Sequence, residues 1–121
     1  HHPKELNVLI NSVYSLYPEK KITCVFQPHL FSRTKEFLND FATALSRVNR
    51  LILLDIYPAR EEPIKNFGID DLFIRIKLNK KIVLNKKDVC EYLLKTNCEL
   101  IIVVGAGDIH EIIPELKKRL I

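Results

Sequence analysis

Hydrophobic positions along the chain alternate between helical spacing and short, nearly unbroken apolar runs. In the first segment, which ends at Pro18, apolar side chains recur at helical spacing at Leu6, Leu9, Ile10, Val13, Leu16 and Tyr17. A β-branched run, "KITCVF", follows, and a second helical pattern comes after it at Phe37, Leu38, Phe41, Leu45 and Val48. Ser32 or Thr34 stands where a side chain could cap this second helix. The first part of the chain therefore predicts helix, strand and helix.

The rest of the chain repeats the alternation. "RLILLDIY" is typical of a strand covered on both faces, and "PAREEPIKNFG" predicts an exposed loop. "IDDLFIRI" predicts a short helix capped by Asp70, "KKIVL" a weak strand, and "KKDVCEYLLKT" a helix with Val89, Cys90, Leu93 and Leu94 inward. "ELIIVV" predicts the last buried strand, which leads through "GAGD" into a closing helix with Pro114 near its start and Leu116 and Leu120 along it.

Strands that alternate with helices at this spacing predict an α/β, Rossmann-like fold with a mostly parallel sheet and helices on both faces. Residues 1–121 are expected to form one domain. In such a sheet the carboxyl ends of the strands open onto one edge, where ligands bind at the point of reversal in strand order. If the order is doubly wound, the first and last strands are neighbours. The segments "QPHLFSRT", "DIYPAREEP" and "GAGD" then meet at that edge.

Composition narrows the class of protein. The chain is 47% hydrophobic and 28% charged, as expected of a globular domain, and its net charge of +4 comes with scattered lysines that do not predict nucleic-acid binding. Cys24, Cys90 and Cys98 have neither disulfide-framework nor zinc-site spacing, which favours reduced thiols in a cytoplasmic protein. No apolar run approaches membrane-spanning length, and we expect no membrane contact.

His29 and Arg33 are the first candidates for chemistry. A guanidinium suits a carboxylate or phosphate, and an imidazole near a helix N-terminus could complete an anion clamp. A structural interpretation is also open, in which His29 caps a loop and Arg33 pairs with Glu36.

Two further segments carry polar groups at the same edge. Asp55, Arg60, Glu61 and Glu62 surround Tyr57, and their carboxylates could orient a metal-bound nucleotide or a ribose, although a charged loop is usually only solvated. "GAGD" lacks the third glycine of a dinucleotide fingerprint. Tight packing explains it, with Asp108 as N-cap and Glu111 completing a capping box. Motifs alone predict no complete catalytic site and no metal site.

Four segments taken together carry more information than any single motif. "HHPKEL", "FQPHLFSRT", "LLDIYPAREEP" and "GAGDI", in this order and at these separations, resemble the C-terminal domain of the Mur ligases. The resemblance runs nearly end to end, and within the family it is strongest to the members that add L-alanine. It implies that His1 and His2 are native residues and not remnants of a tag, and that the chain is one domain of a larger three-domain enzyme.

The resemblance also implies a reaction. Such an enzyme joins L-alanine to the lactyl carboxylate of UDP-N-acetylmuramic acid in peptidoglycan synthesis, with ATP and Mg²⁺, through an acyl phosphate that the amine attacks. An N-terminal domain of the same chain would bind the UDP sugar, and a central domain would hold most of the ATP and Mg²⁺. The isolated C-terminal domain is then expected to fold but to be inactive.

Residue roles follow from the resemblance position by position. His29 and Arg33 match positions that face the incoming alanine and the product carboxylate, with His1 nearby. Asp55, Tyr57 and Arg60 match a loop on the nucleotide side, and three residues, Gly105, Gly107 and Asp108, match a structural loop at the edge of the site. Leu30 departs from the family, because some members have a second arginine there.

Two other functions stay open. A ligase of the same superfamily that attaches a preformed peptide to muramic acid would share the fold and most of the loops. A stand-alone Rossmann-like module would use the same crevice as an effector site.

Overall fold

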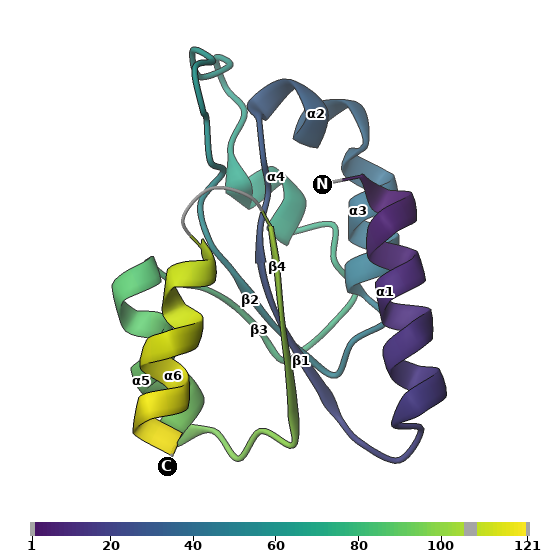
Figure 1. The fold of residues 1–121 in the computed structure, drawn as a ribbon. Coiled ribbons are helices and arrows are strands. Elements are labelled where there is room, and N and C mark those ends of the chain that lie inside the picture. The colour runs from purple at the N-terminus through teal and green to yellow at the C-terminus, as the bar shows by residue number, and fades with distance from the viewer. Residues whose placement is uncertain (1, 106–108, 121) are drawn as a thin grey trace.

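The structure is a computed structural model that describes residues 2–105 and 109–120 (Figure 1). In chain order the elements are α1 (Pro3–Leu16), β1 (Ile22–Gln27), α2 (Phe31–Glu36), α3 (Leu38–Leu45), β2 (Arg50–Leu53), α4 (Ile69–Phe73), β3 (Lys81–Val83), α5 (Lys86–Lys95), β4 (Leu100–Gly105), a 3₁₀ turn (Ile109–Glu111) and α6 (Ile112–Leu120). Within the described ranges, no helix has the length and apolar character needed to cross a membrane.

The four strands form one parallel sheet in the order β3-β2-β1-β4. The first and last strands are neighbours over their full length, from Ile22 opposite Leu100 to Gln27 opposite Gly105. The predicted α/β fold with a parallel sheet is thus confirmed, as is the pairing of these two strands. All four strands run upward in Figure 1, so that their carboxyl ends face the same edge of the sheet.

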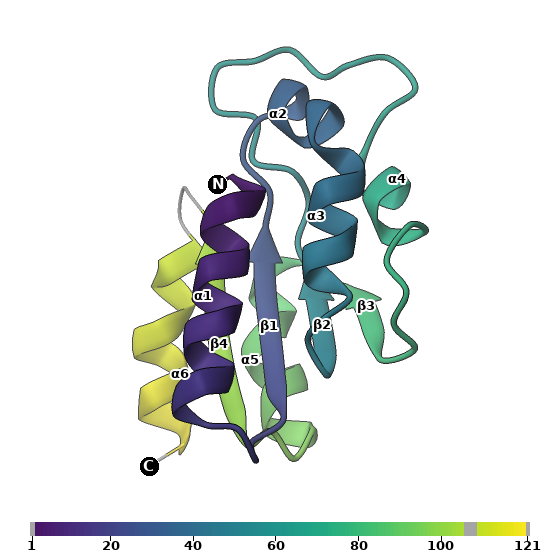
Figure 2. The same ribbon diagram turned by 90° about the vertical axis from the view of Figure 1, so that its right-hand side faces the viewer.

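Helices cover both faces of the sheet because successive strand residues point to opposite sides. Cys24 and Phe26 of β1 pack with α1, α3 and α4 on one face, while Val25 packs with α5 and α6 on the other. Figures 1 and 2 show α1 and α3 on one side of the strands and α5 and α6 on the opposite side. β1 and β2 lie between two apolar layers, which explains their continuous hydrophobic runs.

The end of the sheet differs from the prediction. The run "ELIIVV" was expected to be fully buried, but every residue of β4 is only half-buried because β4 is an edge strand. Leu94 of α5 was expected to face inward, and 40% of it is exposed.

Helix starts are the other departures. Neither Ser32 nor Thr34 caps the second helix, which begins at Phe31 and is interrupted at Phe37, so that α2 and α3 are separate. The Thr34 hydroxyl donates to the Leu30 carbonyl at 2.7 Å instead. Asp70 does not cap α4, since the cap position is Gly68.

Candidate functional site

The loops that follow β1 and β2 continue side by side beyond the ends of their strands. His29 and Tyr57 form a parallel bridge. The Tyr57 N–H donates to the Pro28 carbonyl at 2.8 Å, and the Leu30 N–H donates to the Tyr57 carbonyl at 2.9 Å. Two segments that are distant in sequence therefore form one surface at the carboxyl edge of the sheet.

His29 is held in place by Tyr57. The two rings are stacked with their centroids 5.9 Å apart and an interplanar angle of 20°. The imidazole is half-buried, and its Nδ1 atom is buried. The structure thus brings His29, which was expected on the substrate side, into contact with Tyr57, which was expected on the nucleotide side.

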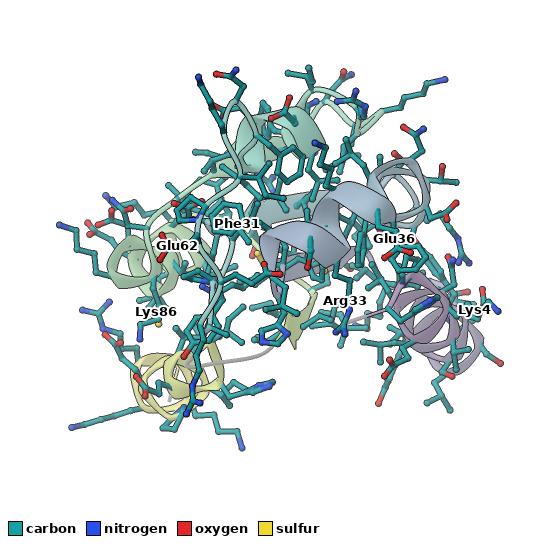
Figure 3. The ribbon with its side chains drawn as sticks, turned by 90° about the horizontal axis from the view of Figure 1, so that it is seen from above. Lys4, Phe31, Arg33, Glu36, Glu62 and Lys86 are labelled. Carbon is teal, nitrogen blue, oxygen red and sulfur yellow. The ribbon has the colours of Figure 1, made fainter. Side chains whose placement is uncertain are left out.

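Arg33 lies on α2, four residues after His29 in the sequence. Its side chain is half-buried, and among the described residues its guanidinium makes no hydrogen bond or ion pair. The alternative pairing of Arg33 with Glu36 does not occur. In Figure 3, which looks down on the carboxyl edge, Arg33 lies on the side of α2 nearer α1. A planar cation without a partner in the described part of the chain is suited to an external carboxylate or phosphate.

The turn that leads into α2 is conformationally strained. Leu30, the N-cap residue, has φ 70° and ψ 133° and provides no side-chain cap. A branched residue at positive φ costs free energy and persists only where surrounding contacts hold it, and such positions often occur at functional sites. The hydrogen bonds from Leu30 to Tyr57 and from Thr34 to Leu30 supply those contacts.

Glu61 reaches from the loop after β2 to the start of α2. Its carboxylate accepts a hydrogen bond from the Ser32 N–H at 3.2 Å and another from the Ser32 hydroxyl. The bond from the hydroxyl is the main reason that the pKa of Glu61 is lowered, and an attraction to His29 adds to it. From the sequence, the Glu61 carboxylate could either orient a nucleotide or ribose or be only solvated, and no pattern in the sequence indicates Ser32 as its partner.

Asp55 and Arg60, the other residues expected on the nucleotide side, differ in the hydrogen bonds that they make. The Asp55 carboxylate accepts from the Ile56 N–H at 2.8 Å, while the Asp55 carbonyl accepts from the Gln27 amide at 3.3 Å. Arg60 is exposed and makes no hydrogen bond or ion pair with the described residues. Asp55 is therefore oriented by its own loop, and Arg60 extends into solvent.

Gly105 ends β4 directly beside Gln27. Its φ is 146°, and a Cβ atom at this position would lie 2.6 Å from the Gln27 carbonyl oxygen. Only glycine permits this approach of the two strands. Three other expected site residues, His1, Gly107 and Asp108, lie outside the described residues, and Asp108 is the expected N-cap of the proposed capping box.

His2 has a structural role that the sequence analysis did not assign. Its Nδ1 accepts from the Lys4 N–H at 3.1 Å as the N-cap of α1, and its ring packs on Phe37 at 4.6 Å between centroids. A side chain able to accept at this position, followed by Pro3 at the first helical position, is the sequence signal that could have predicted it.

The cysteines and acidic residues form no metal centre within the described ranges, where no group of three His, Cys, Asp or Glu side chains could hold an ion. Cys24 is buried in β1, and burial raises the pKa of its thiol to about 12. Burial likewise raises the pKa of Cys90. Both thiols lie in the apolar core, where they pack against neighbouring side chains.

Comparison with known proteins decides the family. No family model matches the chain. UDP-N-acetylmuramate–L-alanine ligases match it over almost its entire length, with 45% identity in Flavobacterium psychrophilum, 42% in Parabacteroides distasonis and 39% in Ruthia magnifica. By sequence, the chain belongs to the Mur ligases. These three alignments include 99%, 99% and 98% of this chain. They include only 27%, 26% and 26% of the respective relatives, so the chain spans about a quarter of their length.

A solved Mur ligase domain has the same fold. It belongs to a candidate UDP-N-acetylmuramate:L-alanyl-γ-D-glutamyl-diaminopimelate ligase of Haemophilus ducreyi. The TM-score is 0.72 with 14% sequence identity, over 100% of this chain and 85% of that domain. At this identity the similarity concerns the α/β architecture alone.

Proposed function

We propose that the chain is the C-terminal domain of a UDP-N-acetylmuramate–L-alanine ligase, an ATP-dependent enzyme that forms an amide bond in peptidoglycan synthesis. The observation that carries the proposal is 45% identity, over 99% of the chain, to a ligase of that name. The chain spans about a quarter of that relative's length. An N-terminal and a central domain of the same longer protein would supply the rest of the enzyme.

In the proposed reaction, ATP phosphorylates the lactyl carboxylate of UDP-N-acetylmuramic acid, and the amine of L-alanine attacks the acyl phosphate. Phosphate then leaves the tetrahedral intermediate. The alanine carboxylate needs a cation that orients the amine toward the acyl carbon. Arg33 fits this role because its guanidinium is half-buried and has no partner among the described residues. His29, stacked on Tyr57, would lie beside it on the alanine side.

ATP and Mg²⁺ would be held mainly by the central domain. The described residues contain no ready cluster of metal ligands, so we assign no step to a metal held by this chain. Arg60 extends from the loop after β2 and has no partner among residues 2–105 and 109–120, and with Tyr57 it could contact the nucleotide when the domains close. A reaction that uses a UDP sugar and ATP would take place in the cytoplasm.

The test is acceptor-dependent ADP release by the full-length protein that carries this chain, given ATP, Mg²⁺ and UDP-N-acetylmuramic acid. Release with L-alanine and little with a tripeptide would support the proposal. Release with a tripeptide but not with L-alanine would identify the peptide-adding alternative. A folded protein that releases ADP with neither acceptor would leave the stand-alone binding module as the better interpretation.

A further inference from the structure

The helix that carries Arg33 cannot cap itself. α2 has only six residues, and its N-cap residue Leu30 provides no side-chain acceptor. The first backbone N–H groups of a helix have no partner within the helix, and a missing cap weakens the first turn. A helix this short depends on contacts from elsewhere in the molecule.

Glu61 supplies the missing acceptor from another segment. One carboxylate oxygen accepts from the Ser32 N–H at 3.2 Å, and the other accepts from the Ser32 hydroxyl. Negative charge at a helix N-terminus also complements the helix dipole. Ser32 directly precedes Arg33, so this contact restrains the backbone next to the guanidinium.

Glu61 is itself held at a defined position. Its N–H donates to the Pro58 carbonyl at 2.9 Å and closes a turn in which Ala59 has φ 54°. That turn follows Tyr57, whose backbone is paired with Pro28 and Leu30. Glu61 therefore rests on the same paired loops that hold His29. In Figure 3, neighbouring Glu62 is seen beside Phe31, on the part of this loop that passes α2.

We propose that Glu61 is a positioning residue for Arg33: its carboxylate caps α2 across the two loops and holds the guanidinium in the orientation that binds the amino-acid carboxylate. This inference rests on the proposed function for the identity of the substrate. Glu61 touches no reacting atom. Its effect on catalysis passes through Ser32 and the first turn of α2.

The kinetic test uses the full-length protein and compares Glu61→Ala with the matched control Glu62→Ala. Glu62 is an exposed neighbour with no hydrogen bond or ion pair among the described residues. We expect Glu61→Ala to raise the KM for L-alanine roughly five- to tenfold, the size of a lost helix cap, and to leave the KM for ATP near its original value. Glu61→Gln retains one acceptor oxygen and should fall in between. Equal alanine KM values for the two alanine variants would overturn the proposal.

A double variant tests whether Glu61 acts through Arg33. In an Arg33→Ala background, Glu61→Ala should add less than about a twofold change in kcat/KM for L-alanine, because the group that it positions is gone. Losses that multiply would overturn the proposal.

Amide hydrogen exchange separates this inference from the proposed function. In Glu61→Ala, and also in Ser32→Ala, amides of residues 31–33 should exchange faster than in Glu62→Ala. Equal exchange in the three variants would overturn the capping role, whatever the substrate. If the original protein does not use L-alanine at all, the proposed function fails, and this exchange comparison still decides whether Glu61 holds α2.

Discussion

His29 and Arg33 are four residues apart in the sequence, but their surroundings differ. The imidazole of His29 is stacked on the ring of Tyr57. Backbone hydrogen bonds join the loop that carries Tyr57 to the loop that carries His29. The guanidinium has no hydrogen-bond or ion-pair partner in the described part of the chain. Replacing His29 would thus disturb the edge itself, whereas replacing Arg33 should remove a contact made only with a ligand. Arg33 is therefore the cleaner target for testing substrate recognition.

Arg33→Ala in the full-length protein should reduce kcat/KM for L-alanine about 10- to 100-fold, mainly through KM. A hydrogen bond to a charged group contributes about 1.5–3 kcal/mol, and this one would be lost. Lys35→Ala, which removes an exposed cation from the same helix, is the control and should leave both constants nearly unchanged. Steady-state ADP release measures them. Unchanged alanine KM and kcat in Arg33→Ala would exclude the proposed role.

Substitution of Gly105 tests whether the close contact between β4 and β1 at this edge contributes to stability. Gly105→Ala would place a Cβ atom 2.6 Å from the Gln27 carbonyl oxygen at φ 146°, so we expect a loss of about 2–4 kcal/mol in the free energy of unfolding. Gly68→Ala is the control, because no atom lies within 4 Å of a Cβ there and its φ of −162° is ordinary extended backbone. Its effect should stay within about 0.5 kcal/mol. Urea denaturation measures the free energy of unfolding of both variants. Equal values for Gly105→Ala and Gly68→Ala would contradict the importance of the contact between Gly105 and Gln27.

Among the elements, β1 has the most constrained surroundings. It lies between β2 and β4, and five of its six residues are buried. Helices from both apolar layers cover it. Within this strand the Cys24 thiol is fully enclosed, and its pKa is raised from 9.0 to about 12. The folded strand thus keeps a proton that the unfolded chain releases in alkali.

This difference makes stability depend on pH in a defined direction. Below about pH 9 both states keep the proton and Cys24 has no effect, whereas between about pH 9 and pH 12 only the unfolded chain loses it, so stability falls as pH rises. Cys24→Ala should make this fall shallower by up to about 1.4 kcal/mol per pH unit. Denaturant unfolding at several alkaline pH values measures the slope. Cys24→Val should give the same shallow slope, since neither residue ionises, and a slope equal to that of the original chain would contradict the buried thiol.

At the scale of the whole molecule, this chain matches about a quarter of each relative, and its candidate site lies at one edge of the sheet. Arg33 and Arg60 extend from that edge without partners in the described residues. Under the proposed function such groups would form only part of an active site, because catalysis of acyl transfer needs water to be excluded and charge to be stabilised from several sides.

The isolated 121-residue chain should therefore fold but release no ADP above background with ATP, Mg²⁺, UDP-N-acetylmuramic acid and L-alanine. The full-length protein under the same conditions is the positive control, and circular dichroism with cooperative thermal unfolding shows that the isolated chain is folded. Turnover by the isolated chain would mean that it contains the complete nucleotide and sugar sites.

Sequence patterns were sufficient for the order of the strands along the chain, for most of the helices and for the parallel sheet, but not for the break between α2 and α3 at Phe37. Apolar periodicity reports burial, and two buried faces leave a continuous run that is easily recognised in β1 and β2. The quoted segments were also sufficient for the family, which the comparisons confirm. The same patterns led to errors at the helix starts and at Leu94, where the outcome depends on which neighbour packs there.

Tertiary structure decided how the edge is held together. Ser32 looked like a cap for its own helix, yet its hydroxyl and N–H bind Glu61, which lies in a different loop. His2 joins α1 to Phe37, and Gly105 is required by Gln27 of the neighbouring strand. Local sequence records which groups can donate, accept or fit a backbone conformation. Which partner each group meets depends on strand order and register, because these bring distant segments within hydrogen-bonding distance.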